Sequence, residues 1–228
     1  MGHRRAGDKG GRRMRLTTTG TARNFDTEIL GVISTEHLPH SERNRRILFV
    51  GANETVHDED VAGYRALLCH DELNHDISVP YVHHLRESDH IRHGDIVVLG
   101  PAIGLVRSLY RPYELHHHLF VTERCNSNCL MCSQPPKDRD DVHALTERNL
   151  ELISLIMPHP PYLTITGGEP TILGDNLFKL ITQLKQSMSE TELHVLTNGR
   201  TFAWPQYSRR FAALEHPKIS LAARGARS

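Results

Sequence analysis

The chain has 228 residues, of which 38% are hydrophobic and 24% are charged, as in an ordinary globular protein. Its 27 basic and 27 acidic residues cancel, which excludes an overall charge that would draw it to nucleic acid or to an anionic membrane. No apolar run approaches the roughly 20 residues of a membrane span, and no signal peptide is visible at the start. We therefore expect neither nucleic acid nor a membrane among its partners.

The first half of the sequence shows a basic tail followed by short β-like runs. Residues 1–15 are rich in Gly and Arg, so we expect a disordered tail, and Met14 is an alternative start to Met1. Residues 16–111 are expected to form a small β-rich domain with strands at 28–33 and 47–50. Further expectations there are a hairpin of 96–99 with 104–110, a short helix at 61–69, and a buried structural thiol at Cys69.

From about residue 116 onward, predicted strands alternate with predicted helices. Strands are expected at 119–122, 162–166 and 193–197, with a fourth beginning at 218–222. A helix over 146–157 would present Leu150, Ile153 and Met157 on one face. A second, amphipathic helix, with Asn176 as its cap, carries Leu177, Leu180, Ile181, Leu184 and Met188. With a third helix at 205–214, this alternation predicts parallel β/α units, which bind ligands at the carboxyl ends of their strands.

Three of the four cysteines, Cys125, Cys129 and Cys132, crowd together just after the first of these strands. A disulfide framework spreads its cysteines along the chain, so this cluster favours a metal site in a reducing compartment, and we expect the cytoplasm. Thiolates suit iron–sulfur clusters, and three of them leave one iron of a four-iron cube open for a ligand. The alternative is structural zinc, with its fourth ligand drawn from His116, His117, His118 or His143.

Two further motifs follow the next two predicted strands. The loop Gly167-Gly168-Glu169-Pro170 has two glycines, which let the backbone approach a ligand closely. The Glu169 side chain, or a backbone carbonyl there, could receive an ammonium group. Thr197-Asn198-Gly199 ends the third predicted strand. Alone it is a weak signal, because Asn-Gly is a common turn. Its position at the same strand-end face as the other two motifs supports a functional role.

These three motifs, in this order, resemble the radical S-adenosylmethionine (SAM) superfamily, and the resemblance covers residue 116 onward. It implies a [4Fe–4S] cluster on Cys125, Cys129 and Cys132, with SAM on the open iron, and reductive cleavage of SAM as the chemistry. No general acid or base is implied. It also implies that SAM is bound by the Gly-Gly-Glu-Pro loop, which consists of Gly167, Gly168, Glu169 and Pro170. Thr197, Asn198 and Met131 are expected to lie near the cofactor.

Within this superfamily, residues 120–136 are most similar to the C-type radical maturases of the His-Xaa-Ser system. That similarity implies a peptide or small protein with His-Xaa-Ser repeats as substrate. It also implies a second radical maturase and a small protein as partners, and an external electron donor. The alternatives are another radical SAM reaction, such as activation of an enzyme or a small-molecule rearrangement, and a zinc-stabilised binding module without catalysis.

The resemblance also sets an expectation about completeness. Enzymes of this family use a partial barrel of about six β/α units, whereas residues 116–228 supply three units and the start of a fourth strand. We therefore expect an α/β fold in which a β-rich domain precedes the N-terminal part of a truncated β/α barrel. Such a chain would have an unprotected sheet edge, poor solubility and little or no activity on a peptide.

Overall fold

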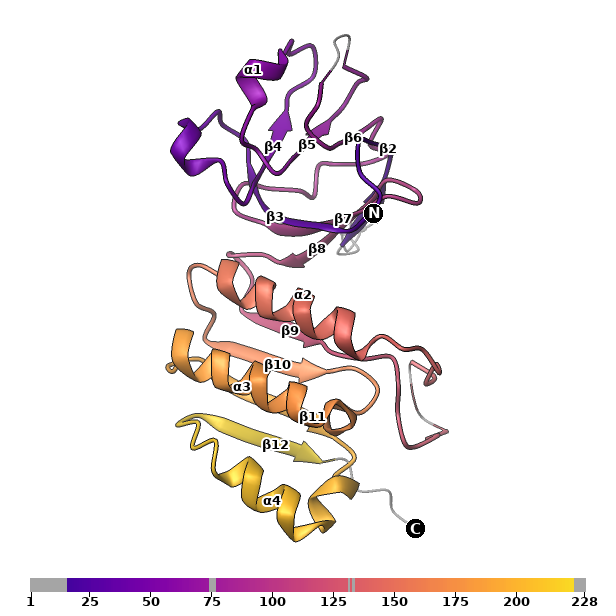
Figure 1. The fold of residues 1–228 in the computed structure, drawn as a ribbon, viewed down its shortest axis with the longest axis vertical. Coiled ribbons are helices and arrows are strands. Elements are labelled where there is room, and N and C mark those ends of the chain that lie inside the picture. The colour runs from indigo at the N-terminus through magenta and orange to yellow at the C-terminus, as the bar shows by residue number, and fades with distance from the viewer. Residues whose placement is uncertain (1–15, 74–76, 131, 133, 224–228) are drawn as a thin grey trace, which may run out of the picture.

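A computed structural model describes residues 16–73, 77–130, 132 and 134–223 of the chain. The tail expected at 1–15, with both possible start residues, lies outside the described residues, and so do Met131 and residues 224–228. The described part contains two sheets that lie one above the other along the long axis (Figure 1). It holds no helix that is both long and apolar enough to cross a membrane.

The first sheet has eight strands in the order β1-β8-β7-β3-β4-β5-β6-β2. Their bounds are Thr17–Thr19 for β1, Thr21–Arg23 for β2, Ile29–Ser34 for β3, Arg46–Val50 for β4, Ala66–Cys69 for β5, Tyr81–His83 for β6, Ile96–Gly100 for β7 and Leu105–Tyr110 for β8. Two short helical segments accompany them, η1 (His40–Glu42) and α1 (Asp58–Val61).

This first sheet closes on itself at Gly20. The two edge strands, β1 and β2, are consecutive in the chain and only Gly20 separates them, so one segment pairs with β8 and then with β6. The Gly20 amide donates to the Gly104 carbonyl at 3.0 Å, and a Cβ at Gly20 would overlap the His83 carbonyl oxygen. Glycine therefore allows the strand to change partners. Inside the closed sheet lies a core that includes Ile33, Ile47 and Val97.

All four strands predicted for this half are present, and one predicted helix is wrong. The hairpin of β7 and β8 is confirmed, with Leu99 opposite Val106. The segment 61–69 is not a helix: α1 ends at Val61, and Ala66–Cys69 is β5, paired in parallel with β4 and β6. All four β5 side chains are buried because both faces of the strand are covered, and such a run lacks the alternation that identifies a strand. Cys69 is buried, as expected.

The second sheet confirms the predicted alternation of strands and helices. Its four strands, all parallel, lie in the order β12-β11-β10-β9, with helices on one face (Figure 1). The strands are β9 (His116–Phe120), β10 (Tyr162–Thr166), β11 (Glu192–Thr197) and β12 (Ile219–Ala223). The helices are α2 (Val142–Leu155), η2 (Pro170–Leu173), α3 (Asp175–Ser187), η3 (Arg200–Ala203) and α4 (Pro205–Ala212).

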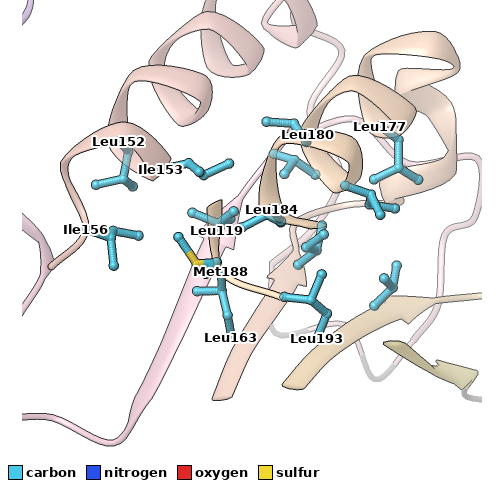
Figure 2. Close-up of a cluster of buried hydrophobic side chains, with 14 of the residues drawn as sticks. Leu119, Leu152, Ile153, Ile156, Leu163, Leu177, Leu180, Leu184, Met188 and Leu193 are labelled. Atoms are coloured by element: carbon cyan, nitrogen blue, oxygen red, sulfur yellow. The ribbon is translucent and has the colours of Figure 1, made fainter. Parts of the chain in front are cut away.

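The apolar face of α3 packs on this sheet as its periodicity predicts. Leu177, Leu180 and Leu184 are fully buried and point toward Leu119, Leu163 and Leu193 of the strands (Figure 2). Two details of the helix predictions are wrong. Gly174, with φ 55°, occupies the cap position predicted for Asn176. Met157 is 67% exposed beyond the end of α2, because Pro158 disfavours helical conformation in the residue before it.

Helix α2 also contacts the first sheet. The core around Leu152 and Ile153 continues into β3 and β7 through Leu30, Ile96 and Val98. The Tyr110 hydroxyl donates to the Pro158 carbonyl at 2.5 Å, and Arg65 forms an ion pair with Glu151 of α2. The predicted boundary at 111–116 separates the two sheets, but they share one core, so division into two domains stays a prediction.

Candidate functional site

The three sequence motifs come together at the carboxyl ends of three neighbouring strands. Phe120, at the end of β9, pairs with Thr166, at the end of β10, and β11 lies on the other side of β10. The cysteine loop, residues 121–141, follows β9. The Gly-Gly-Glu loop, residues 167–169, follows β10, and Asn198 follows β11 directly. Parallel strands thus deliver segments far apart in sequence to one edge of the sheet.

A polar neck closes the cysteine loop at its base. The Asp141 carboxylate accepts hydrogen bonds from the Thr122 hydroxyl and the Glu123 amide, each at 2.7 Å. The Lys137 amide donates to the Glu123 carbonyl at 3.0 Å, and Lys137 Nζ lies 2.7 Å from the Glu123 carboxylate. The first and last residues of the loop are therefore fixed, and the segment with the cysteines is held between them.

All three cysteines of this loop are free thiols that solvent can reach. Cys125 is half-buried, while Cys129 and Cys132 are exposed. The Cys132 thiol donates to the Gln134 carbonyl at 2.7 Å. Among the residues that the structure describes, no three His, Cys, Asp or Glu side chains are close enough to hold a metal ion. Met131, predicted to lie beside the cofactor, is outside the described residues.

The glycines of the Gly-Gly-Glu loop bring it into backbone contact with the start of the cysteine loop. The Gly168 amide donates to the Thr122 carbonyl at 2.7 Å, and the Glu169 amide donates to the Arg124 carbonyl at 2.9 Å. A Cβ added at Gly168 would overlap the Arg124 carbonyl oxygen, and one at Gly167, with φ 150°, would lie 2.5 Å from the Thr122 carbonyl oxygen. The sequence analysis attributed the two glycines to close approach of the backbone to a ligand. In the structure, their backbone closely approaches the cysteine loop.

The Glu169 side chain points into the protein rather than toward an open ligand position. It is 1% exposed, and its carboxylate accepts four hydrogen bonds. One oxygen accepts from the Thr171 amide, the Thr171 hydroxyl and the Thr197 hydroxyl, at 3.1, 2.7 and 2.6 Å. The other oxygen accepts from the Asn198 amide at 2.7 Å. The carboxylate joins the ends of β10 and β11. Binding of an ammonium group by this side chain or by a backbone carbonyl of the loop stays a prediction.

The remaining predicted residues occupy the same edge in different ways. Pro170 is buried at the first position of η2, and Thr197 is buried at the end of β11. Asn198 is half-buried and faces the cysteine loop, where its amide group donates to Asn126 at 2.6 Å. Of the predicted cofactor residues that the structure describes, Gly167, Gly168, Glu169 and Asn198 contact the cysteine loop directly.

The histidines proposed for a zinc site are not grouped with the cysteines. His116 begins β9, so it lies at the opposite end of that strand from the cysteine loop. His117 is buried against the Tyr110 ring, and its Nε2 lies 2.9 Å from the Glu114 carbonyl. Burial lowers the pKa of His117. His118 projects from the middle of β9, and His143 lies exposed in the first turn of α2, beside the neck of the loop.

Several residues that shape this site were not identified from the sequence. Thr122 and Asp141 form the neck, and the buried Asn149 side chain of α2 donates to the Phe120 carbonyl at 3.0 Å. Tyr207 of α4 lies near the Glu169 carboxylate; burial, together with that negative charge, raises its pKa to about 12. The one signal available was Asp141, an acidic residue directly before a helix start, where such residues are preferred.

Comparison with known families now adds a finding independent of this geometry. Residues 119–223 match the family model of the radical SAM superfamily. The match spans β9 to β12, just under half of the chain, and includes all three motifs. Neither a curated protein sequence nor a solved structure matches the chain. The radical SAM match therefore supports the superfamily, and no homologue supports the narrower His-Xaa-Ser assignment.

The residues present fit the cofactors of this superfamily by their chemistry. Three free thiols without a disulfide partner are the soft ligands that an iron–sulfur cluster needs. They lie on a loop whose base is fixed, with two of them open to solvent.

Proposed function

We propose that this chain is a radical SAM enzyme that holds a [4Fe–4S] cluster on Cys125, Cys129 and Cys132. One observation carries the proposal: the three free thiols lie on a closed loop that is fixed, backbone to backbone, against the Gly-Gly-Glu loop. Both loops fall within the segment that matches the radical SAM superfamily. When bound, the cluster supplies one electron to cleave SAM reductively.

The proposal gives each residue a role that agrees with its position. The three thiolates would bind iron, and the half-buried backbone of Gly167 and Gly168 would line the methionine end of SAM. The buried Glu169 carboxylate would orient this loop and the end of β11 rather than touch the cofactor. These residues thus bind and orient the cofactors, and no general acid or base is assigned.

The narrower substrate assignment rests on the resemblance of residues 120–136 alone. We propose a peptide or small protein with His-Xaa-Ser repeats as the substrate. A second radical maturase, a small partner protein and an external electron donor would act beside the chain, in the reducing cytoplasm. The test is co-expression with a His-Xaa-Ser repeat peptide: a mass change in the peptide that requires Cys129 supports it, and an unchanged peptide opposes it.

The test of the enzyme class is iron loading after anaerobic reconstitution. The wild-type chain should bind about four irons and absorb broadly near 400 nm, as thiolate-ligated clusters do. Cys129→Ala should lose this absorbance, whereas Cys69→Ala, which changes a buried thiol of β5, should keep it. Tight binding of one zinc and no iron would favour the zinc-stabilised module, and full loading of Cys129→Ala would refute the ligand assignment.

A further inference from the structure

Asn126 and Ser127 of the cysteine loop are hydrogen-bonded to residues at the end of β11 whose side chains have no role in the proposed function. Asn198 Nδ2 donates to Asn126 Oδ1 at 2.6 Å and to Ser127 Oγ at 3.2 Å. Arg200 Nη1 donates to the Asn126 carbonyl at 3.0 Å. These contacts join residues more than 70 positions apart in the sequence, and their partners on the cysteine loop follow Cys125 directly.

Asn198 is itself held in place by Glu169 and by the backbone of Arg200. Its backbone amide donates to the buried Glu169 carboxylate at 2.7 Å, and its Oδ1 accepts from the Arg200 amide at 3.0 Å. The side-chain amide therefore has its oxygen directed to Arg200 and its nitrogen directed to the loop. A buried carboxylate with four donors is rigid, because each bond that breaks would leave a polar group unsatisfied in the interior. Glu169 thereby fixes the position from which Asn198 acts.

We propose that Asn198 and Arg200 form a clasp that positions the cysteine loop for cluster binding, with Glu169 as its anchor. This inference rests on the proposed function and extends it, because it assigns positioning residues for the metal loop on a different strand from the cysteines. The neck at Asp141 fixes the base of the loop, and the clasp fixes the residues next to Cys125. Without the clasp, the loop would have to be ordered at the moment of cluster binding, which costs conformational entropy.

Four variants test the clasp, and two further variants serve as matched controls. Asn198→Asp keeps the size of the side chain but removes the donor, and Arg200→Ala removes the second contact. Asn126→Ala removes the acceptor, whereas Asn126→Asp keeps it and should behave as wild type. The controls are Asn176→Ala and Arg209→Ala, which change a half-buried and an exposed residue on α3 and α4 that make no described side-chain contact with the loop.

Two measurements are made, one without metal and one with it. In the metal-free chain, amide hydrogen exchange of residues 124–130 should be about threefold to tenfold faster in Asn198→Asp, Arg200→Ala and Asn126→Ala. In the reconstituted chain, an iron chelator should remove iron faster by a similar factor in the same three variants. Asn126→Asp and both controls should match wild type in both measurements.

The outcomes separate this inference from the function beneath it. If wild type binds no iron but the three variants still exchange faster, the proposed function is wrong and the clasp is supported as a positioning device. If wild type binds iron and the three variants exchange and lose iron at the wild-type rate, the clasp is refuted. Equal exchange in Asn126→Asp and Asn126→Ala would also refute it, since only the former retains the acceptor.

Discussion

Gly168 is the residue at which the two loops of the site come closest. Its amide donates to Thr122, and there is no space for a Cβ beside the Arg124 carbonyl. Because the obstacle is backbone, no side-chain rotation can relieve the overlap. This contact explains why glycine is needed at this position. From the sequence alone, the glycines had been explained by close approach of the backbone to a ligand.

We predict that Gly168→Ala lowers the free energy of unfolding by more than about 2 kcal/mol, as overpacking against backbone does. Gly100→Ala is the matched control, because its Cβ would lie at 3.4 Å from the Leu105 Cβ, an ordinary contact. Urea unfolding followed by circular dichroism measures both. Equal stability of Gly168→Ala and wild type would mean that the two loops are not in backbone contact.

Glu169→Gln tests whether the buried carboxylate is structural. The amide keeps the shape but replaces one acceptor oxygen with a donor group, which would face a hydroxyl or the Asn198 amide. We predict a loss of about 1–3 kcal/mol in the free energy of unfolding. Glu147→Gln, an exposed change on α2, should cost nothing measurable. A fully stable Glu169→Gln chain would return Glu169 to the role of a cofactor ligand.

The buried carboxyl of Asp95, directly before β7, should make the stability of the chain depend on pH. Burial raises the pKa of its carboxyl from an ordinary 3.8 to about 6, although the Arg92 amide and Arg111 lie beside it. A raised pKa in the folded state means that the folded chain binds the proton more tightly than the unfolded chain does. The resulting stability is present at pH 4 and is lost as pH rises through about 6.

We therefore predict that wild type gains about 2–3 kcal/mol relative to Asp95→Asn as pH falls from 7.5 to 4. The measurement is urea unfolding of both chains at several pH values. Asp89→Asn, an exposed change nearby, should follow the wild-type curve throughout. A wild-type advantage that grows toward high pH would contradict the sign of the shift.

At the scale of elements, the strands and helices that could be predicted are those with a clear period. The apolar positions of α3 repeat every three or four residues, and each proved buried. β5 was misread because its buried run has no period, and β1, β2 and β6 were missed because three residues are too short to show one. The closing of the first sheet depends on long-range pairing at Gly20, which no local pattern carries.

The element that joins the two sheets is α2. Its buried residues contact both the second sheet and the strands β3 and β7 of the first. Ile153→Ala should therefore lower the free energy of unfolding by about 2–4 kcal/mol and leave a single transition for the whole chain. Thermal unfolding by circular dichroism checks this, with the exposed Glu147→Ala as the control. Two separate transitions would show that the sheets fold independently.

At the scale of the whole molecule, parallel topology produces the site. The sequence could predict that motifs after successive strands meet at one edge, because the carboxyl ends of parallel strands share that edge. It could not predict how they meet. The inward turn of Glu169, the neck at Asp141 and the contact of Asn198 with Asn126 all join residues distant in sequence, and single-residue types do not encode such pairings.

The central claim is that three cysteines hold a cluster whose fourth iron is open to SAM. Electron paramagnetic resonance of the anaerobically reconstituted and reduced wild-type chain, with and without SAM, tests it most directly. We predict the signal of a reduced four-iron cluster whose shape changes when SAM is added, and no such signal in Cys129→Ala. A cluster signal that SAM leaves unchanged, or one that survives in Cys129→Ala, would contradict the account.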